Sequence, residues 1–189
     1  MATQVTPVKY PQVGVCGLSC RLCPRYHTDA KSRCEGCKTE SRMAAGCPFL
    51  TCAVKRRGLA FCWQCEDHPS CARWRKHREH GRYYDSFVCY RALEDNLAYV
   101  QRRGVARFEQ AQKVRERLLS TMLRDFTDGR SKTYYCLAAT VLPIDNLRLA
   151  LDTAHKQAAG ADPKERAKLL RTLLDQLAAR ADVLLKLRR

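Results

Sequence analysis

The chain lacks a long apolar segment. Its longest mostly apolar run, from Cys136 to Pro143, is far too short to cross a bilayer as a helix. The first residues, Met-Ala-Thr-Gln-Val-Thr-Pro, also lack the apolar centre of a secretory signal. We therefore expect a cytoplasmic protein without a membrane span, in a compartment where thiols stay reduced.

Large aliphatic residues are scarce between residues 16 and 71. This segment holds only Leu18, Leu22, Leu50, Val54 and Leu59. Burial of so few side chains does not offset the conformational entropy lost when the segment folds. The segment therefore needs cross-links, either disulfides or bound metal.

Acidic residues are also few, with 19 Asp and Glu against 35 Lys and Arg, which gives a formal net charge of +16. Thiolate ligands of a bound metal would reduce this excess without cancelling it. Basic proteins tend to meet nucleic acid, ribonucleoprotein, anionic lipid or an acidic partner. We expect a macromolecular partner, either protein or RNA or DNA, although the even spread of charge over the chain favours no single face.

Recognisable catalytic motifs are missing. The sequence contains no phosphate loop, no nucleophile elbow, no H-E-x-x-H and no pair of acids at a characteristic spacing. The C-x3-C-x2-C run at 16–23 is similar to the radical S-adenosylmethionine motif. That chemistry requires a barrel of alternating strands and helices, which the rest of the chain does not predict. We therefore favour a non-catalytic protein, with an enzyme that carries an open metal site near Cys16, Cys71 and His68 as a further alternative.

Cysteine, in contrast, is abundant. The chain holds 12 cysteines, and all except Cys89 and Cys136 fall between residues 16 and 71. Two residues between cysteines let both sulfurs reach one ion from a tight turn, so the repeated C-x-x-C spacing favours metal over disulfides. Gly36, inside one such unit, stands where a metal knuckle needs a positive φ. The candidate ligands are Cys16, Cys20, Cys23, Cys34, Cys37, Cys47, Cys52, Cys62, Cys65 and Cys71.

The pairing of these ligands is left open by the sequence. Four pairs, Cys20/Cys23, Cys34/Cys37, Cys47/Cys52 and Cys62/Cys65, suffice for two four-thiolate sites, joined either in sequence or as a cross-brace. Cys16 and Cys71 flank the set, and with His68 or His27 they could complete a third site or replace a ligand. Cys89 and Cys136 lie in apolar surroundings and are predicted to be buried thiols without a metal.

Zinc is the expected metal, with two or more ions, because it suits closed four-thiolate sites built from closely spaced cysteines. A 4Fe-4S cluster is the alternative, since it also takes four thiolates and would make the protein an electron carrier or redox sensor. Cys-Pro at 23–24 and at 47–48 is typical of ferredoxins, but the complete ferredoxin run is absent.

A family resemblance rests on the same motifs. The runs C-G-L-S-C-R-L-C-P, C-E-G-C, C-x4-C and C-W-Q-C-E-D-H-P-S-C resemble a group of small cysteine-rich proteins of bacteria and archaea that open with C-G-x-x-C-x-x-C. The group is an uncharacterised domain of unknown function, presumed to bind zinc. The resemblance covers about residues 13–75 and implies metal binding through the cysteines named above, but no reaction.

A basic stretch with aromatic residues follows the last cysteines, at 73–84. It is able to contact phosphates and to stack on bases. The alternative interpretation is a solvated helix face with Trp74 tucked into the cysteine-rich segment. The candidate partner surface comprises Arg73, Arg75, Lys76 and Arg78, extended by Lys55, Arg56 and Arg57.

The predicted fold is mainly α. An extended arm at 1–12 precedes a small, irregular, metal-stabilised head at 13–80, similar to a zinc ribbon or knuckle. The head packs on a body at 81–189, which is a bundle of about four to six helices. Apolar periodicity and breakers predict helices over 69–80 (stopped by Gly81), 90–100, 105–126, 132–142, 144–154 and 162–184.

The last helix has the clearest start, with Asp162 as N-cap, Pro163 in the first turn and Glu165 completing a capping box. Its apolar stripe is too wide for a strict coiled-coil seam, so we expect an intramolecular bundle and a monomer. The stripe comprises Ala167, Leu170, Leu174, Leu177, Ala181 and Leu184.

Overall fold

The computed structural model describes residues 9–39, 42, 46–86 and 88–189. Most of the predicted N-terminal arm therefore lies outside the described residues. The described part is mainly helical and contains no strand, only an isolated antiparallel bridge between Val13 and Ser19. None of its helices is both long and apolar enough to cross a membrane.

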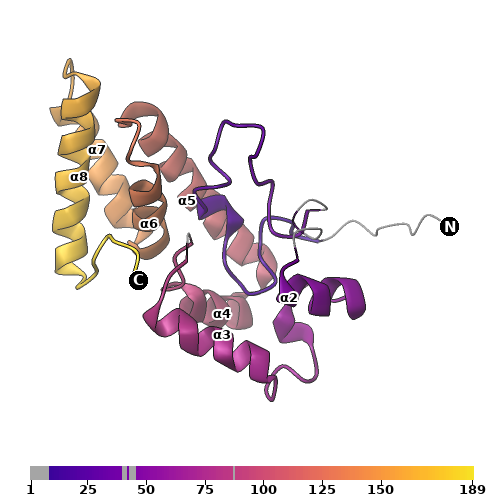
Figure 1. Ribbon diagram of the computed structural model, residues 1–189. Coiled ribbons are helices and arrows are strands. Elements are labelled where there is room, and N and C mark those ends of the chain that lie inside the picture. The colour runs from indigo at the N-terminus through magenta and orange to yellow at the C-terminus, as the bar shows by residue number, and fades with distance from the viewer. Residues whose placement is uncertain (1–8, 40–41, 43–45, 87) are drawn as a thin grey trace.

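Four helices form the body (Figure 1). They are α5 (Val105–Asp125), α6 (Lys132–Val141), α7 (Ile144–Gln157) and α8 (Pro163–Arg180). Two further helices, α3 (Ala72–Tyr83) and α4 (Leu93–Arg103), lie at one end of the bundle. The mainly helical prediction is confirmed.

The head is built from loops and short helical pieces. These are η1 (Cys20–Leu22), α2 (Pro48–Leu50), the π-helical turn η2 (Thr51–Arg56) that continues α2, and η3 (Cys62–Gln64). The helical segment at 48–56 is not predicted by the sequence, since its apolar residues are too few to show a helical period.

The main core lies between α5, α6, α7 and α8, with fully buried Leu119, Tyr135, Leu147 and Leu170. Leu22 of η1 belongs to the same cluster, so the head is anchored by inserting its first helical turn into the body. Arg21, beside it, pairs with Glu109 and Glu116 on α5 at 3.4 and 2.6 Å.

The predicted helix boundaries at Asp162 and Gly104 are confirmed. The carboxylate of Asp162 accepts hydrogen bonds from the backbone N–H groups of Lys164 and Glu165 at 2.7 and 3.0 Å, as an N-cap does. The reciprocal bond from the Glu165 side chain, which a full capping box requires, is not formed among the described residues. Gly104, with φ of +79°, separates α4 from α5.

The prediction that Gly81 ends the first long helix is wrong. Helix α3 continues through this residue to Tyr83. Gly81 is buried, and a Cβ there would lie 3.3 Å from Cβ of Tyr90. The glycine therefore serves close packing of α3 against residue 90, not helix termination.

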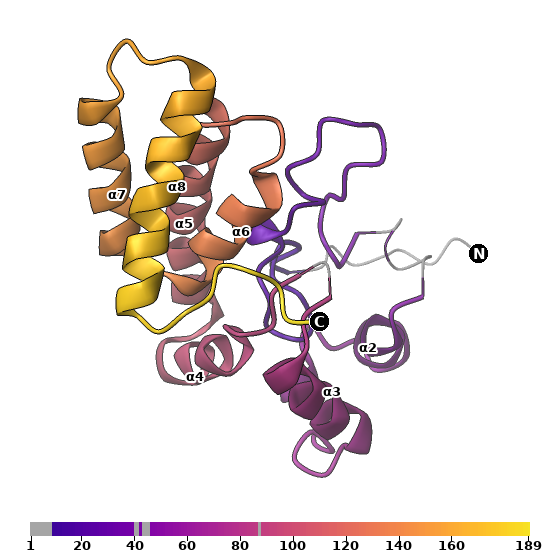
Figure 2. The same cartoon turned by 60° about the vertical axis from the view of Figure 1, so that its left-hand side comes forward.

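The apolar stripe of the last helix is buried only in part, at Ala167, Leu170 and Leu174. Helix α8 ends at Arg180, and the chain reverses at Asp182, which has φ of +52°. Leu184 is therefore exposed, contrary to the prediction. Figure 2 shows the tail after α8 running back toward α3.

Candidate metal centre

Six cysteines line one cavity in the head. The cavity has a volume of about 290 Å³, and its walls also include Phe49, Leu50 and Tyr90. We call it the six-cysteine cavity; its cysteines are Cys16, Cys20, Cys23, Cys34, Cys37 and Cys47. Residues spread over 32 positions of an irregular chain thus converge on a single small volume.

Backbone hydrogen bonds and one glycine set this convergence. The N–H of Cys20 donates to the carbonyl of Gln12 at 2.8 Å, and the N–H of Cys37 donates to Sγ of Cys20 at 3.2 Å. Gly36 has φ of +133°, and a Cβ at this position would lie 2.8 Å from the carbonyl oxygen of Pro11. Only glycine fits there, in agreement with the conformation expected for a metal knuckle.

Burial and contacts between thiols shift the pKa values of several of these cysteines. Burial, together with neighbouring Cys37 and Cys47, raises the pKa of Cys16 to about 12. The thiol of Cys37 has its pKa lowered to about 7 by a hydrogen bond with Cys20, whose own pKa is raised by the same bond and by burial. The thiols of Cys16, Cys20 and Cys23, whose pKa values are raised, would therefore stay protonated without a nearby cation, and metal binding would release their protons.

A lysine is buried among the thiols. Lys38 is 2% exposed, and its Nζ lies 3.6 Å from the centroid of the Phe61 ring. Burial lowers the pKa of Lys38 to about 8, against the opposing effect of Cys20, Cys16 and other thiols. A buried ammonium of this kind compensates negative charge that thiolates acquire when they bind a cation.

The remaining four cysteines of the segment, Cys52, Cys62, Cys65 and Cys71, lie outside this cavity, and we call them the second group. The pKa of Cys62 is raised to about 12, first by burial and then by the charges of Cys16, Cys52 and Cys71, so this residue lies between the two groups. Arg57 donates from Nη1 to Sγ of Cys65 at 2.8 Å and pairs with Asp67 at 2.6 Å. Cys47 lines the six-cysteine cavity and Cys52 does not, although the charges of both raise the pKa of Cys62.

The histidines differ in their freedom to bind metal. Nε2 of His27 is engaged with the carbonyl of Arg21 at 2.6 Å. Nε2 of His68 is buried without a hydrogen-bond partner in the described structure, and this residue shares a surface hollow with Cys71. Burial also lowers the pKa of His68, which keeps its imidazole neutral and fit for coordination.

A further histidine, His77, was missed by the sequence analysis. It lines the six-cysteine cavity, packs its ring 4.7 Å from that of Phe49, and has a buried, unpartnered Nε2. Trp74 and His77 are three residues apart and so share a face of α3. The buried tryptophan was the signal that this face points inward.

No group of three or more His, Cys, Asp or Glu side chains in the described part of the chain is arranged to hold an ion as it stands. The donor set nevertheless fits a thiophilic metal, since soft thiolates and neutral imidazoles are ligands for zinc and for iron–sulfur clusters. The buried charge of Lys38 and the unpartnered nitrogens of His68 and His77 fit the same kind of group.

The other two cysteines lie outside both groups. Cys136 is buried in α6, and burial raises the pKa of its thiol to about 12. Cys89 is buried as well, and burial raises its pKa. Both side chains have the buried setting that their apolar sequence surroundings predict.

The candidate partner surface is only partly free. Lys55, Arg56, Arg75 and Lys76 are exposed. Others are engaged within the protein: Arg78 with Glu94, Arg57 as described, and Arg73 with the carbonyl of Pro48 at 3.4 Å. Trp74 is buried against the head, as the alternative interpretation of this helix predicts. Tyr83 and Tyr84, at the end of α3, are exposed.

Together, these features define a helical protein with a cysteine-rich head compatible with metal binding. Residues 12–76 match the model of a family described as "Protein of unknown function (DUF3795)". The match confirms the resemblance to an uncharacterised cysteine-rich family for this segment. No curated protein and no solved structure matches the chain.

Proposed function

We propose that residues 16–71 bind metal through cysteine thiolates and that the metal holds the head in its folded form. The convergence of six cysteines on one cavity carries this proposal. Within the head alone there is one apolar cluster of three buried residues, and two further small clusters are shared with α4 and α5. This limited burial does not stabilise the fold of the head sufficiently, and bound metal would supply the missing stability.

Zinc is the metal we favour, in two or more sites. The six-cysteine cavity would supply ligands to one site, and Cys52, Cys62, Cys65 and Cys71 to another, with His68 or His77 available as nitrogen ligands. Zinc has no redox chemistry of its own, so in such sites it cross-links the chain.

A 4Fe-4S cluster is the second candidate, and the size and apolar walls of the six-cysteine cavity favour it. The cavity of about 290 Å³ is larger than one tetrahedral ion requires, and its walls include Phe49, Leu50 and Pro48. Such a cluster would make the protein an electron carrier or redox sensor.

Anaerobic purification followed by elemental analysis separates these candidates. Zinc at two or more equivalents, with a colourless protein, supports the zinc proposal. Iron and sulfide with a broad visible absorbance band support the cluster. Protein that folds fully with neither metal contradicts both.

We further propose that the head serves a non-catalytic role by binding single-stranded nucleic acid through α3 and η2. Exposed Lys55, Arg56, Arg75 and Lys76 would contact phosphates, and exposed Tyr83 would stack on a base. If nucleic acid does not bind, we propose that this basic surface binds an acidic protein instead.

A further inference from the structure

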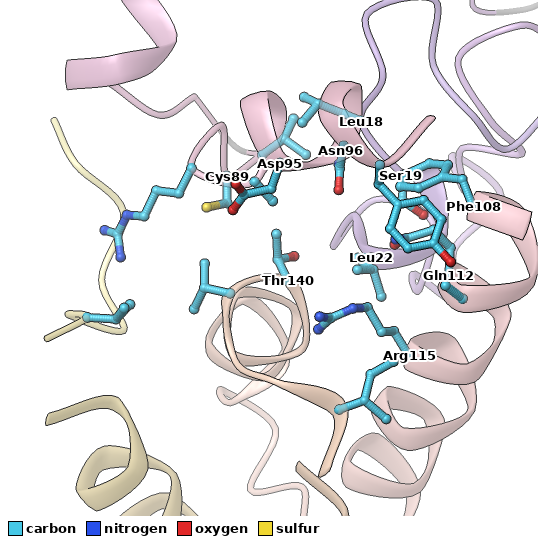
Figure 3. A pocket seen from close by; sticks show the side chains of 18 residues that line it. Leu18, Ser19, Leu22, Cys89, Asp95, Asn96, Phe108, Gln112, Arg115 and Thr140 are labelled. Carbon is cyan, nitrogen blue, oxygen red and sulfur yellow. The ribbon is translucent and has the colours of Figure 1, made fainter. Parts of the chain in front are cut away.

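A second cavity, with a volume of about 410 Å³, lies where the head meets the body. Figure 3 shows side chains from the head, α4, α5 and α6 converging on it. It adjoins the six-cysteine cavity, with which it shares Leu18, Ser19 and Val88, but the only cysteine that lines it is Cys89. Most of its lining is apolar, including Leu18, Leu22 and Phe108.

One face of α5 brings a cation to this cavity. Phe108, Ala111, Gln112 and Arg115 all line it, at the spacing that places residues on one side of a helix. Nη1 of Arg115 donates to the carbonyls of Ala139 and Leu142, both at 2.7 Å, which fixes the guanidinium in place.

Arg115 has no acidic partner in the described part of the chain. Its neighbour Glu116 pairs with Arg21 on another face of α5. Its Nε and Nη2 make no hydrogen bond to described residues, so three of its five N–H donors stay available. The guanidinium is half-buried and burial lowers the pKa of Arg115, so an anion that reaches it through the cavity gains a charge-assisted pair.

Two polar side chains of low exposure, Ser19 and Gln112, line the same cavity. The hydroxyl of Ser19, a residue 8% exposed, is buried and lacks a hydrogen-bond partner in the described structure. Gln112, a residue 6% exposed, also lines the cavity and can offer its side-chain amide there. A hydroxyl and an amide of this kind suit the oxygen atoms of a ligand.

The charges at the opposite side limit which anion fits. Figure 3 shows Asp95 and Asn96 of α4 across the cavity from Arg115. Asp95 is exposed, and the other cation of the lining, Arg91, is engaged with Asp85 and with carbonyls of the C-terminal tail. One free cation facing one carboxylate suits a monoanion with an apolar skeleton better than a dianionic phosphate.

We propose that this cavity binds a small organic acid, whose carboxylate pairs with Arg115 and whose carbon skeleton lies against the apolar walls. The arginine fork matches a carboxylate with two parallel hydrogen bonds, and Ser19 or Gln112 completes the polar contacts.

Ligand-observed NMR titration with 3-phenylpropionate, and with its uncharged amide as the matched probe, tests the proposal. The full-length, metal-loaded protein should bind the acid at least about tenfold more tightly than the amide, since a charge-assisted pair is lost in the amide. Arg115→Met should abolish this preference, while Arg117→Met, exposed on the same helix, should keep it.

Two further variants keep the test decisive if Arg115→Met does not fold. Arg115→Lys keeps the charge and should weaken binding, because the two parallel bonds are lost. Ala111→Leu adds bulk to the cavity wall and should reduce binding of the acid and the amide alike. Equal binding of acid and amide, no binding of either at about 10 mM, or unchanged binding in Ala111→Leu would overturn the proposal.

Discussion

The carboxylate of Asp85 lies 3.0 Å from Nη2 of Arg188, although the two residues are 103 positions apart in the chain. The Asp85 side chain has no exposed surface, and it also accepts from the backbone N–H groups of Tyr90 and Arg188. Arg188 further donates to the carbonyls of Gly81 and Arg82 at the end of α3. The C-terminal tail thereby fastens α3 to the end of the helical bundle.

The first prediction concerns this fastening. Arg188→Met should lower the free energy of unfolding by about 2 kcal/mol, because a buried carboxylate loses its charged donor. Urea unfolding followed by circular dichroism measures the change. Arg189→Met, at the exposed neighbouring residue, is the control. If Arg189→Met and Arg188→Met have equal free energies of unfolding, the prediction is contradicted.

The second prediction concerns pH. Burial raises the pKa of Asp85, but hydrogen bonds from Arg188 and from backbone N–H groups outweigh it and hold the pKa below 3.8. This carboxylate therefore makes its full contribution to the free energy of unfolding above its unfolded-state pKa, and the contribution is lost as pH falls through its folded-state pKa. The stability difference between wild type and Asp85→Asn should be constant from pH 7 to about pH 5 and shrink toward pH 3. A difference that grew on acidification would show the opposite shift.

The third prediction separates the head from the body after metal removal. The only two tryptophans, Trp63 and Trp74, pack in clusters with residues of the head, whereas the bundle of α5 to α8 contains neither. A strong chelator should shift tryptophan emission to longer wavelength and expose residues 16–71 to protease. The far-ultraviolet signal should largely persist, because structural metal contributes roughly 10 kcal/mol or more to small sites but nothing directly to the bundle. Verified metal loss without a change in emission would count against a structural role.

The fourth prediction compares two cysteines. Cys37→Ser should cost a full equivalent of metal and much of the soluble yield, because its thiol belongs to the six-cysteine cavity. Cys136→Ala should keep the metal content and lose only about 1 kcal/mol of stability, as an ordinary packing change does. Elemental analysis of both variants measures the metal content. Metal loss in Cys136→Ala would show that the metal site includes a residue of the helical body and would contradict the prediction.

The fifth prediction concerns the basic surface. Replacing Arg75 and Lys76 with Ala should weaken binding to labelled single-stranded RNA and lower the slope of log affinity against log salt by about 1 to 2, since fewer counterions are released. Lys164→Ala with Lys168→Ala removes the same charge from exposed positions on α8 and should leave both quantities unchanged. If wild type does not bind RNA at low salt, the nucleic-acid proposal fails and a protein partner takes its place.

The sequence by itself determined the class of fold and several boundaries. Apolar side chains at helical spacing predicted α4, α5, α6 and α7, because one buried stripe per helix is a local pattern. Asp162 and Gly104 fixed ends of helices because N-capping and positive φ are properties of single residues. The scarcity of aliphatic residues beside ten cysteines likewise identified the head.

Tertiary structure alone decided which distant groups meet. The grouping of Cys47 with Cys16, the inward direction of His77 and the role of Gly81 depend on how irregular loops pack, which carries no periodic signal. The pairing of Asp85 with Arg188 and the isolation of Arg115 at a second cavity depend on contacts between segments far apart in the chain. Such contacts follow from the packing of the whole molecule, since no local rule links residues separated by a hundred positions.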